Sequence, residues 1–146
     1  MPNKTDTMLQ LDNQLCFALY STSLAMTKLY KPLLDELGLT YPQYLAMLVL
    51  WEKDGLMVSE LGERLYLDSG TLTPLLKRLE ASGLISRIRA VEDERRVHIT
   101  LTAAGRKLKS RAAKIPGCIL EASQCSIPEL TALTRQMQAL RQRLVA

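Results

Sequence analysis

Apolar residues recur at intervals of three and four near both ends of the chain, which predicts a long amphipathic helix at each end. The first pattern runs from about Leu9 to Leu37 and carries Pro32 near its end, where a bend is expected. The last is the seam formed by Leu130, Leu133, Met137, Leu140 and Leu144. Seams this narrow are typical of helices that pair with a distant segment or with a second chain.

The only continuous apolar run, residues 44–51, predicts a buried central helix from about Pro42 to Lys53. Two shorter helical patterns follow. Ser59 is the expected N-cap of a helix from Glu60 to Tyr66, and residues 68–70 form a turn. A second helix then extends to Ser82.

Pro74 makes the start of that second helix ambiguous, because proline fits only near the first turn of a helix. The sequence therefore predicts a start near Thr73, with Thr73 as the cap. Leu72, Leu75, Leu76 and Leu79 are expected to face inward.

Strand patterns at Ile85–Ala90 and Arg96–Leu101 flank a polar loop. Two helices followed by a hairpin predict a winged helix-turn-helix in residues 57–102. We therefore expect a mainly α protein with a small β-hairpin wing (α+β) that forms one domain, 1–146. Residues 9–37 and 103–146 would be its dimerisation helices, and a monomer with mutually packed termini is the alternative.

The predicted outer face of the second helix carries hydroxyl and basic side chains. Short hydroxyls suit base edges or phosphates and the basic pair suits the DNA backbone, although a plain solvated face has the same composition. The candidates for DNA contact are Ser69, Thr71, Thr73, Lys77 and Arg78.

Arginines flank the loop of the hairpin, and an arginine at such a tip fits the narrow minor groove of DNA. These further candidates are Arg87, Arg89, Arg95 and Arg96. Asp93 is expected to brace the wing, since a carboxylate near phosphate is repelled.

Two helix starts are predicted after the hairpin. Thr102 should cap the first, and Ser126 with Glu129 forms a capping box for the last. Between them, Pro116-Gly117 should interrupt or bend the chain. Basic residues between Arg106 and Lys114 form a solvated face or add attraction to DNA.

The net charge of +4 is distributed unevenly. Residues 103–146 contribute eight Lys/Arg against two Asp/Glu, whereas residues 57–102 contribute seven of each. Overall charge alone therefore does not establish DNA binding. With no signal-peptide core and no membrane-spanning run, the protein is expected to be cytoplasmic, without membrane partners.

The three cysteines, Cys16, Cys118 and Cys125, form no CxxC pair and have no zinc spacing. His98, the single histidine, is interpreted as a surface residue. We therefore expect neither a metal nor an organic cofactor. By themselves, cysteines at these positions are most often packing residues.

Two segments resemble the MarR family of winged helix-turn-helix regulators. They are residues 77–85 (KRLEASGLI) and 93–102 (DERRVHITLT). The resemblance, which extends over nearly the whole chain, implies a homodimer on a palindromic operator. It would place the second helix in the major groove and the wing in the minor groove.

Residues 11–20 (LDNQLCFALY) resemble the organic hydroperoxide resistance regulators, a subgroup of that family, as do Tyr30 and residues 41–44 (YPQY). The resemblance implies that Cys16 reacts with organic hydroperoxide, that Tyr30 and Tyr41 hydrogen-bond its sulfur, and that Tyr20 lies nearby. In two-cysteine members a C-terminal thiol closes an intersubunit disulfide. Here either Cys118 or Cys125 would do so, with Cys118 favoured because a chain break was expected just before it.

These expectations describe a repressor that releases its operator when oxidised, and not an enzyme. A MarR-type repressor released by a small aromatic ligand is the alternative. A thiol peroxidase using Cys16 is a third hypothesis, and the predicted wing and dimer helices argue against it.

Overall fold

The protein, described here from a computed structural model covering residues 3–93 and 96–145, consists of two compact units. The first is Met1–Ala112 and the second is Ala113–Ala146. The boundary lies inside residues 103–146, which the sequence predicts to be one dimerisation segment.

The first unit begins with helices α1 (Lys4–Met8), η1 (Leu11–Asn13) and α2 (Leu15–Asp35). The continuous helix expected from Leu9 is therefore wrong at its start. The side chain of Asn13 donates to the Thr7 carbonyl, and that of Gln14 donates to the Met8 and Gln10 carbonyls. Such side-chain bonds to the backbone compete with helical hydrogen bonds and keep this segment in short turns.

Helix α3 (Tyr41–Glu52) supplies the centre of the first unit, as its apolar run predicts. Thr40 and Gln43 form a capping box at its start, with Pro42 in the first turn. Ala46 and Met47 are fully buried. At its other end, Trp51 Nε1 donates to the Gly105 carbonyl of α6 (Ala103–Ala112) over 3.0 Å, which fixes α6 against the core.

Helices α4 (Val58–Leu65) and α5 (Ser69–Ala81) form the helix-turn-helix. Both predicted caps are wrong. At α4, the Glu60 carboxylate receives the Met57 N–H, so Ser59 lies inside the first turn. At α5, Asp68 caps the helix by accepting from Thr71 N over 2.8 Å, so the helix begins before Thr73 and accommodates Pro74. The four leucines predicted to face inward, Leu72, Leu75, Leu76 and Leu79, are all buried.

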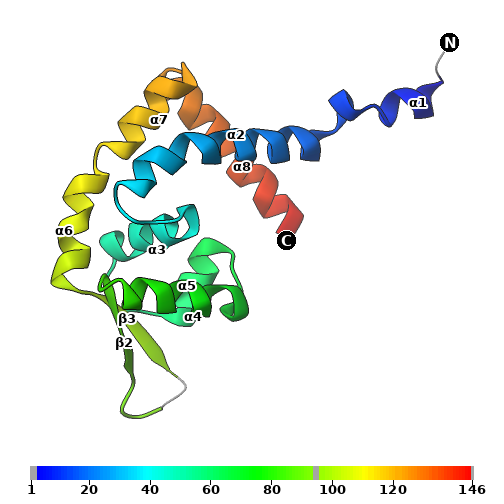
Figure 1. Cartoon of the computed structure of the whole chain (residues 1–146). Helices are drawn as coiled ribbons and strands as arrows, with labels where there is room; N and C mark the ends of the chain where they lie inside the picture. The colour runs from blue at the N-terminus through cyan, green and yellow to red at the C-terminus, as the bar shows by residue number, and fades with distance from the viewer. Residues whose placement is uncertain (1–2, 94–95, 146) are drawn as a thin grey trace. The chain divides into compact units, whose positions relative to one another are not determined.

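The wing consists of β2 (Ile85–Arg89) and β3 (Val97–Leu101), which extend from the first unit as a hairpin (Figure 1). A two-residue strand, β1 (Leu56–Met57), pairs with the other edge of β3, giving the antiparallel order β1-β3-β2. Strand β1 was not predicted, because two residues are too few to show an alternating pattern in the sequence. Ile85, Ile99 and Leu101 anchor the base of the hairpin in the core.

Thr102 caps α6 as predicted, accepting from Gly105 N over 3.0 Å. The second unit contains α7 (Ile115–Ser123) and α8 (Ile127–Val145). The expected break at Pro116-Gly117 is wrong, because Pro116 lies in the first turn of α7 and the interruption falls between α6 and α7. The capping box of Ser126 and Glu129 is confirmed at α8.

Within residues 3–93 and 96–145, no helix is long and apolar enough to cross a membrane.

Candidate functional site

The outer face of α5 presents the polar side chains that the sequence singled out. Ser69, Thr71, Lys77 and Arg78 are exposed, and Thr73 is half-buried. Hydrogen bonds from Thr71 hold the pKa of Asp68 below its ordinary value. The carboxylate therefore stays ionised at the positive end of the helix dipole, which stabilises the start of α5.

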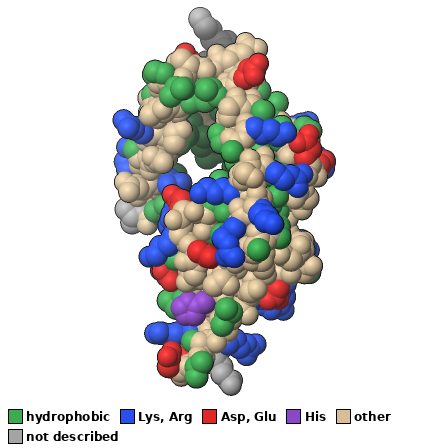
Figure 2. Space-filling model, turned by 90° about the vertical axis from the view of Figure 1, so that its left-hand side faces the viewer, with side chains coloured by type: hydrophobic (Ala, Val, Ile, Leu, Met, Phe, Trp, Pro, Cys, Tyr) green, Lys and Arg blue, Asp and Glu red, His purple; other side chains and the backbone are tan. Residues whose placement is uncertain are grey.

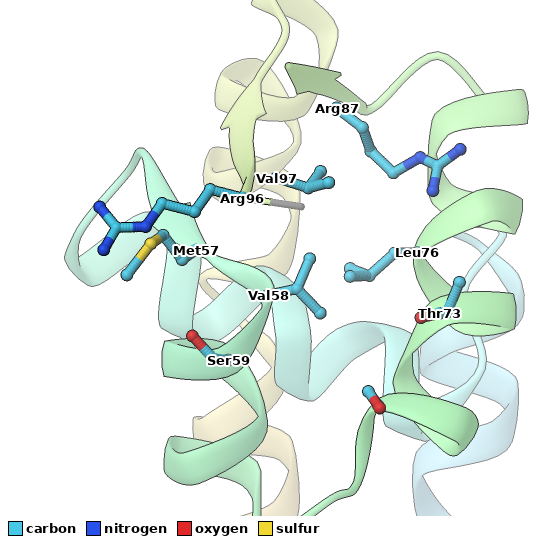
Figure 3. Close-up of a pocket in the computed structure, with 9 residues that line it drawn as sticks. Met57, Val58, Ser59, Thr73, Leu76, Arg87, Arg96 and Val97 are labelled. Carbon is cyan, nitrogen blue, oxygen red and sulfur yellow. The ribbon is translucent and has the colours of Figure 1, made fainter. Parts of the chain in front are cut away.

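A cavity of about 540 Å³ separates α5 from the wing and from the start of α4 (Figure 3). Hydroxyl side chains from both helices line it, including Ser59 and Thr73. Arg87 and Arg96 line it from the wing, but Figure 3 shows that they point in different directions. Arg87 reaches toward the helix that carries Thr73, whereas Arg96 extends past Met57.

The wing carries basic side chains on both of its sides (Figure 2). Arg89 and Arg96 are exposed, as expected of groups available to DNA. Arg87 is instead half-buried and paired with Glu80 of α5. The predicted tip residue Arg95 lies outside the described residues. The carbonyl of Asp93 accepts from Arg96 N over 3.0 Å; the predicted bracing role of its carboxylate stays a prediction.

His98 is half-buried on β3, with Nδ1 3.3 Å from the Gly55 carbonyl. The prediction that His98 is a surface residue is therefore only partly correct, because its ring contacts the main chain. The contact joins the hairpin to the turn before β1.

A second hollow lies between α4 and the start of α5, and Ser59 and Tyr66 are among the residues that line it. Neither was predicted from the sequence to contact DNA. Tyr66 ends α4 in the left-handed conformation, with φ at 58°, and its side chain is exposed. Glycine is the usual residue at this position, so a tyrosine gave no turn signal. Ser59 is available on this surface because Glu60 provides the cap.

Cys16 is the second residue of α2 and is exposed. Its neighbours Leu15, Phe17 and Leu19 are large apolar side chains that are also exposed. Tyr20 lies four residues further on and therefore on the same side of the helix. Exposed apolar side chains continue along α2 and also occur on α8, where Leu133 and Met137 are examples.

Tyr30 and Tyr41 pack together with ring centroids 4.8 Å apart, and Tyr44 adjoins both. Burial, with repulsion from the other two phenols, raises the pKa of Tyr30 to about 12. Burial also raises the pKa of Tyr41. Both hydroxyls therefore keep their protons at neutral pH and can act as hydrogen-bond donors.

The tyrosine pair does not meet Cys16 within one chain. Tyr30 follows Cys16 by fourteen residues on the same helix, which separates them by about 21 Å at 1.5 Å per residue. Tyr41 packs on Tyr30 and is correspondingly remote. The hydrogen bonds implied by the resemblance would therefore need a second copy of the chain.

Cys118 and Cys125 are half-buried free thiols in the second unit. Cys118 lies inside α7, where its N–H donates to the Lys114 carbonyl. Cys125 lies in the turn between α7 and α8, and its Sγ donates to the Ser123 carbonyl over 3.5 Å. The described part of the chain contains no cluster of three or more residues suited to holding a metal ion.

Residues 28–112 match the family model of the SarA/Rot transcriptional regulators. The chain is 57% identical over 140 residues to the organic hydroperoxide resistance transcriptional regulator of Bacillus subtilis strain 168, covering 96% of this chain and 95% of that protein. Both the helix-turn-helix and the segment around Cys16 lie within so long a match.

Two solved structures of AbfR, a protein of Staphylococcus epidermidis, resemble this chain closely. The reduced protein bound to DNA superposes with a TM-score of 0.80 at 34% identity, covering 97% of this chain and 99% of AbfR. The disulfide form superposes less well, with a TM-score of 0.63 at 36% identity, covering 93% and 96%.

Proposed function

The chain belongs to the MarR/SarA family of winged helix-turn-helix transcriptional regulators, which are DNA-binding proteins and not enzymes, and from this premise we propose that it is a repressor released by organic hydroperoxides. The observation that carries the proposal is Cys16, an exposed thiol at the start of α2 surrounded by exposed apolar side chains. The Bacillus subtilis relative, whose name assigns it to organic hydroperoxide resistance, supports it.

Two copies of the chain would form the working unit. The exposed apolar side chains of α2 and α8 are the surfaces that a homodimer would bury. A two-fold dimer presents two copies of α5 and two wings, which suits a palindromic operator. The DNA-contact residues proposed on α5 are Ser69, Thr71, Thr73, Lys77 and Arg78, and on the wing Arg87, Arg89, Arg95 and Arg96.

The dimer would also complete the redox site. Cys16 of one copy would lie against Tyr30 and Tyr41 of the second copy, since the distance along α2 excludes a contact within one chain. Protonated phenols can donate hydrogen bonds to a thiolate and favour it over the thiol. The nearby apolar side chains would favour alkyl hydroperoxides over hydrogen peroxide.

The chemistry proceeds in two steps. The Cys16 thiolate attacks the terminal peroxide oxygen, the O–O bond breaks, and the leaving alkoxide takes a proton to become an alcohol. Cys16 is then a sulfenic acid. A second thiol attacks its sulfur, forming a disulfide and releasing water.

Cys118 and Cys125 are the candidates for the second thiol. A break just before Cys118 would favour this cysteine, but α7 has no break there. Cys125 lies in a turn and can move without opening a helix. The backbone therefore favours Cys125, and an intersubunit disulfide to either cysteine would displace the dimer helices and the DNA-reading elements they carry.

The test combines a non-reducing gel with an operator-binding assay, before and after one equivalent of cumene hydroperoxide. We expect a covalent dimer to form as DNA binding falls, reversed by dithiothreitol and absent in Cys16→Ser, which still binds DNA. Cys118→Ser and Cys125→Ser then identify the second thiol, and equal oxidation rates with hydrogen peroxide would remove the selectivity claim. Release of the operator by peroxide in Cys16→Ser would contradict the proposal.

Loss of operator binding on addition of a small aromatic ligand, with no response to peroxide, would instead support the ligand-released repressor.

A further inference from the structure

The carboxylate of Glu80 joins the last turn of α5 to the middle of the wing strand β2. Its Oε2 accepts the backbone N–H of Arg87 over 3.2 Å, and its Oε1 accepts Arg87 Nε–H over 3.3 Å. One carboxylate therefore binds both the main chain and the side chain of Arg87.

This pair is better shielded than the other ion pairs between described residues. The side chains of Arg87 and Glu80 are 29% and 40% exposed, whereas every partner in the Lys31–Asp35 and Arg64–Glu52 pairs exceeds 50%. Exposed pairs contribute little, because water and salt screen them. A half-buried pair that also satisfies a backbone donor holds its geometry more firmly.

The backbone bond has a particular position in the sheet. Among the described residues strand β2 pairs only with β3, so its other edge has no neighbouring strand there. Arg87 lies opposite Ile99 and turns its N–H away from β3, toward α5. Glu80 thus satisfies an edge donor and, in doing so, sets the distance between the wing strand and the helix.

The connection between α5 and β2 is itself short. Gly83 N donates to the Glu80 carbonyl and Leu84 N to the Leu79 carbonyl, which closes the end of the helix. Beyond this turn the wing runs alongside the cavity that separates it from α5, with Arg87 reaching across (Figure 3). Glu80 therefore connects the two elements beyond the turn, between the last turn of α5 and the middle of β2.

We propose that Glu80 is a positioning residue for DNA binding, acting through Arg87 to hold α5 and the wing in the relative orientation that operator recognition requires. The inference rests on the proposed function, in which α5 and the wing contact DNA. Arg87 was predicted to contact DNA directly. In this proposal its main role is to hold the wing in place relative to α5.

Electrostatic repulsion and positioning predict opposite changes in operator affinity when Glu80 loses its charge. A carboxylate near DNA repels phosphate, so its removal should by electrostatics alone strengthen binding to any duplex. If Glu80 positions the wing, Glu80→Gln should weaken operator binding. Glutamine has nearly the same size as glutamate. Its amide has one acceptor oxygen and one NH2 group, so it cannot accept a hydrogen bond at both of the positions that the two carboxylate oxygens occupy.

The experiment measures the dissociation constants of the reduced protein for an operator duplex and for an unrelated duplex of equal length, over a range of salt concentrations. We expect Glu80→Gln and Glu80→Ala to lose about tenfold in operator affinity, the effect of one charge-assisted hydrogen bond. Affinity for the unrelated duplex should stay equal or rise. The slope of log K against log salt should be kept, since no phosphate contact is lost.

Glu63→Gln is the matched control, because it removes an exposed carboxylate from α4 in the same unit. It should leave operator affinity equal or higher. Thermal unfolding of each variant separates positioning from misfolding, since a misfolded fraction lowers binding to both duplexes alike and leaves their ratio unchanged. In a protein that already carries Arg87→Gln, Glu80→Gln should lower operator affinity by a smaller factor than it does in the unsubstituted protein.

Operator binding by Glu80→Gln that equals or exceeds that of the unsubstituted protein would overturn the proposal. So would an equal loss for both duplexes. Operator binding by the unsubstituted reduced protein is the reference, and its absence would instead contradict the proposed function.

Discussion

The ring of Tyr30, near the end of α2, packs against the ring of Tyr41 at the start of α3, with centroids 4.8 Å apart. The contact joins the two helices at the point where the chain turns between them. It also shields two phenols from water, which raises the pKa of both. A pair of half-buried hydrogen-bond donors therefore lies at the far end of the helix that carries Cys16.

Removing either hydroxyl tests the proposed support of Cys16 by a second copy of the chain. We expect Tyr30→Phe and Tyr41→Phe each to slow the reaction of Cys16 with cumene hydroperoxide at neutral pH by about tenfold, on the scale of one hydrogen bond to a charged group. DNA binding by the reduced protein should be kept. The rate of Cys16 oxidation by cumene hydroperoxide measures the effect.

Tyr44→Phe is the control for that experiment, since Tyr44 belongs to the same ring cluster but has no proposed role toward the sulfur. Equal slowing in all three variants would indicate a packing effect rather than a hydrogen bond.

The raised pKa of Tyr30 predicts a loss of stability at alkaline pH. The folded chain keeps the Tyr30 proton up to a pKa of about 12, whereas the unfolded chain releases it near pH 10. The contribution of Tyr30 is therefore complete below about pH 10 and is lost as pH rises toward about 12. Urea unfolding across this range should show a steeper decline for the unsubstituted protein than for Tyr30→Phe, and parallel curves would refute the prediction.

Gly105 is expected to be irreplaceable for steric reasons. A Cβ at this position would fall on the Leu84 carbonyl oxygen, which is backbone and itself accepts the Thr102 N–H. Gly105→Ala should lower the free energy of unfolding by about 3 kcal/mol, as for an overpacked core. Chemical denaturation measures this change.

Gly117→Ala provides the comparison, because Gly117 lies in α7 with nothing within 4 Å of the added carbon. That substitution should stabilise the protein by a few tenths to about 1 kcal/mol through helix propensity. If Gly105→Ala and Gly117→Ala lowered the free energy of unfolding by similar amounts, the contact with the Leu84 carbonyl would be unimportant.

Asp68 connects the stability of α5 to pH and to DNA binding. Asp68→Ala removes the acceptor of the Thr71 N–H and should lower both the melting temperature and operator affinity, whereas Asp68→Asn keeps an acceptor and should change the melting temperature less. Because hydrogen bonding depresses the pKa of Asp68, its contribution is present above the unfolded value and is lost as pH falls through the folded one. Thermal melts between about pH 2 and pH 7 would test this, and an acid response that Asp68→Asn leaves unchanged would count against it.

Local chemistry made much of this fold predictable. The capping box at Ser126 and the cap at Thr102 depend on residues three apart, and the four leucines of α5 follow one helical period, so each could be read without tertiary information. The resemblance to the MarR family likewise depended on contiguous runs of residues.

The errors arose where two local signals competed. Ser59 is a common N-cap residue, but Glu60 accepts the Met57 N–H and α4 begins at Val58, directly after strand β1. Asp68, and not Thr73, caps α5. A helix that begins at Ser69 includes and buries Leu72, whereas a helix that began after Thr73 would leave Leu72 outside. Pro116 was interpreted as a break, although proline is equally suited to a first turn.

The sequence by itself determined the order of the helix-turn-helix and the hairpin, the inward face of α5 and the identity of the candidate sensor, because these follow from residue periodicity and from contiguous motifs. Only the tertiary structure decided which groups meet. It paired Arg87 with Glu80 and Tyr30 with Tyr41, and it separated Cys16 from the tyrosines along α2. Distances between side chains depend on how helices and strands pack, and one-dimensional spacing does not contain that information.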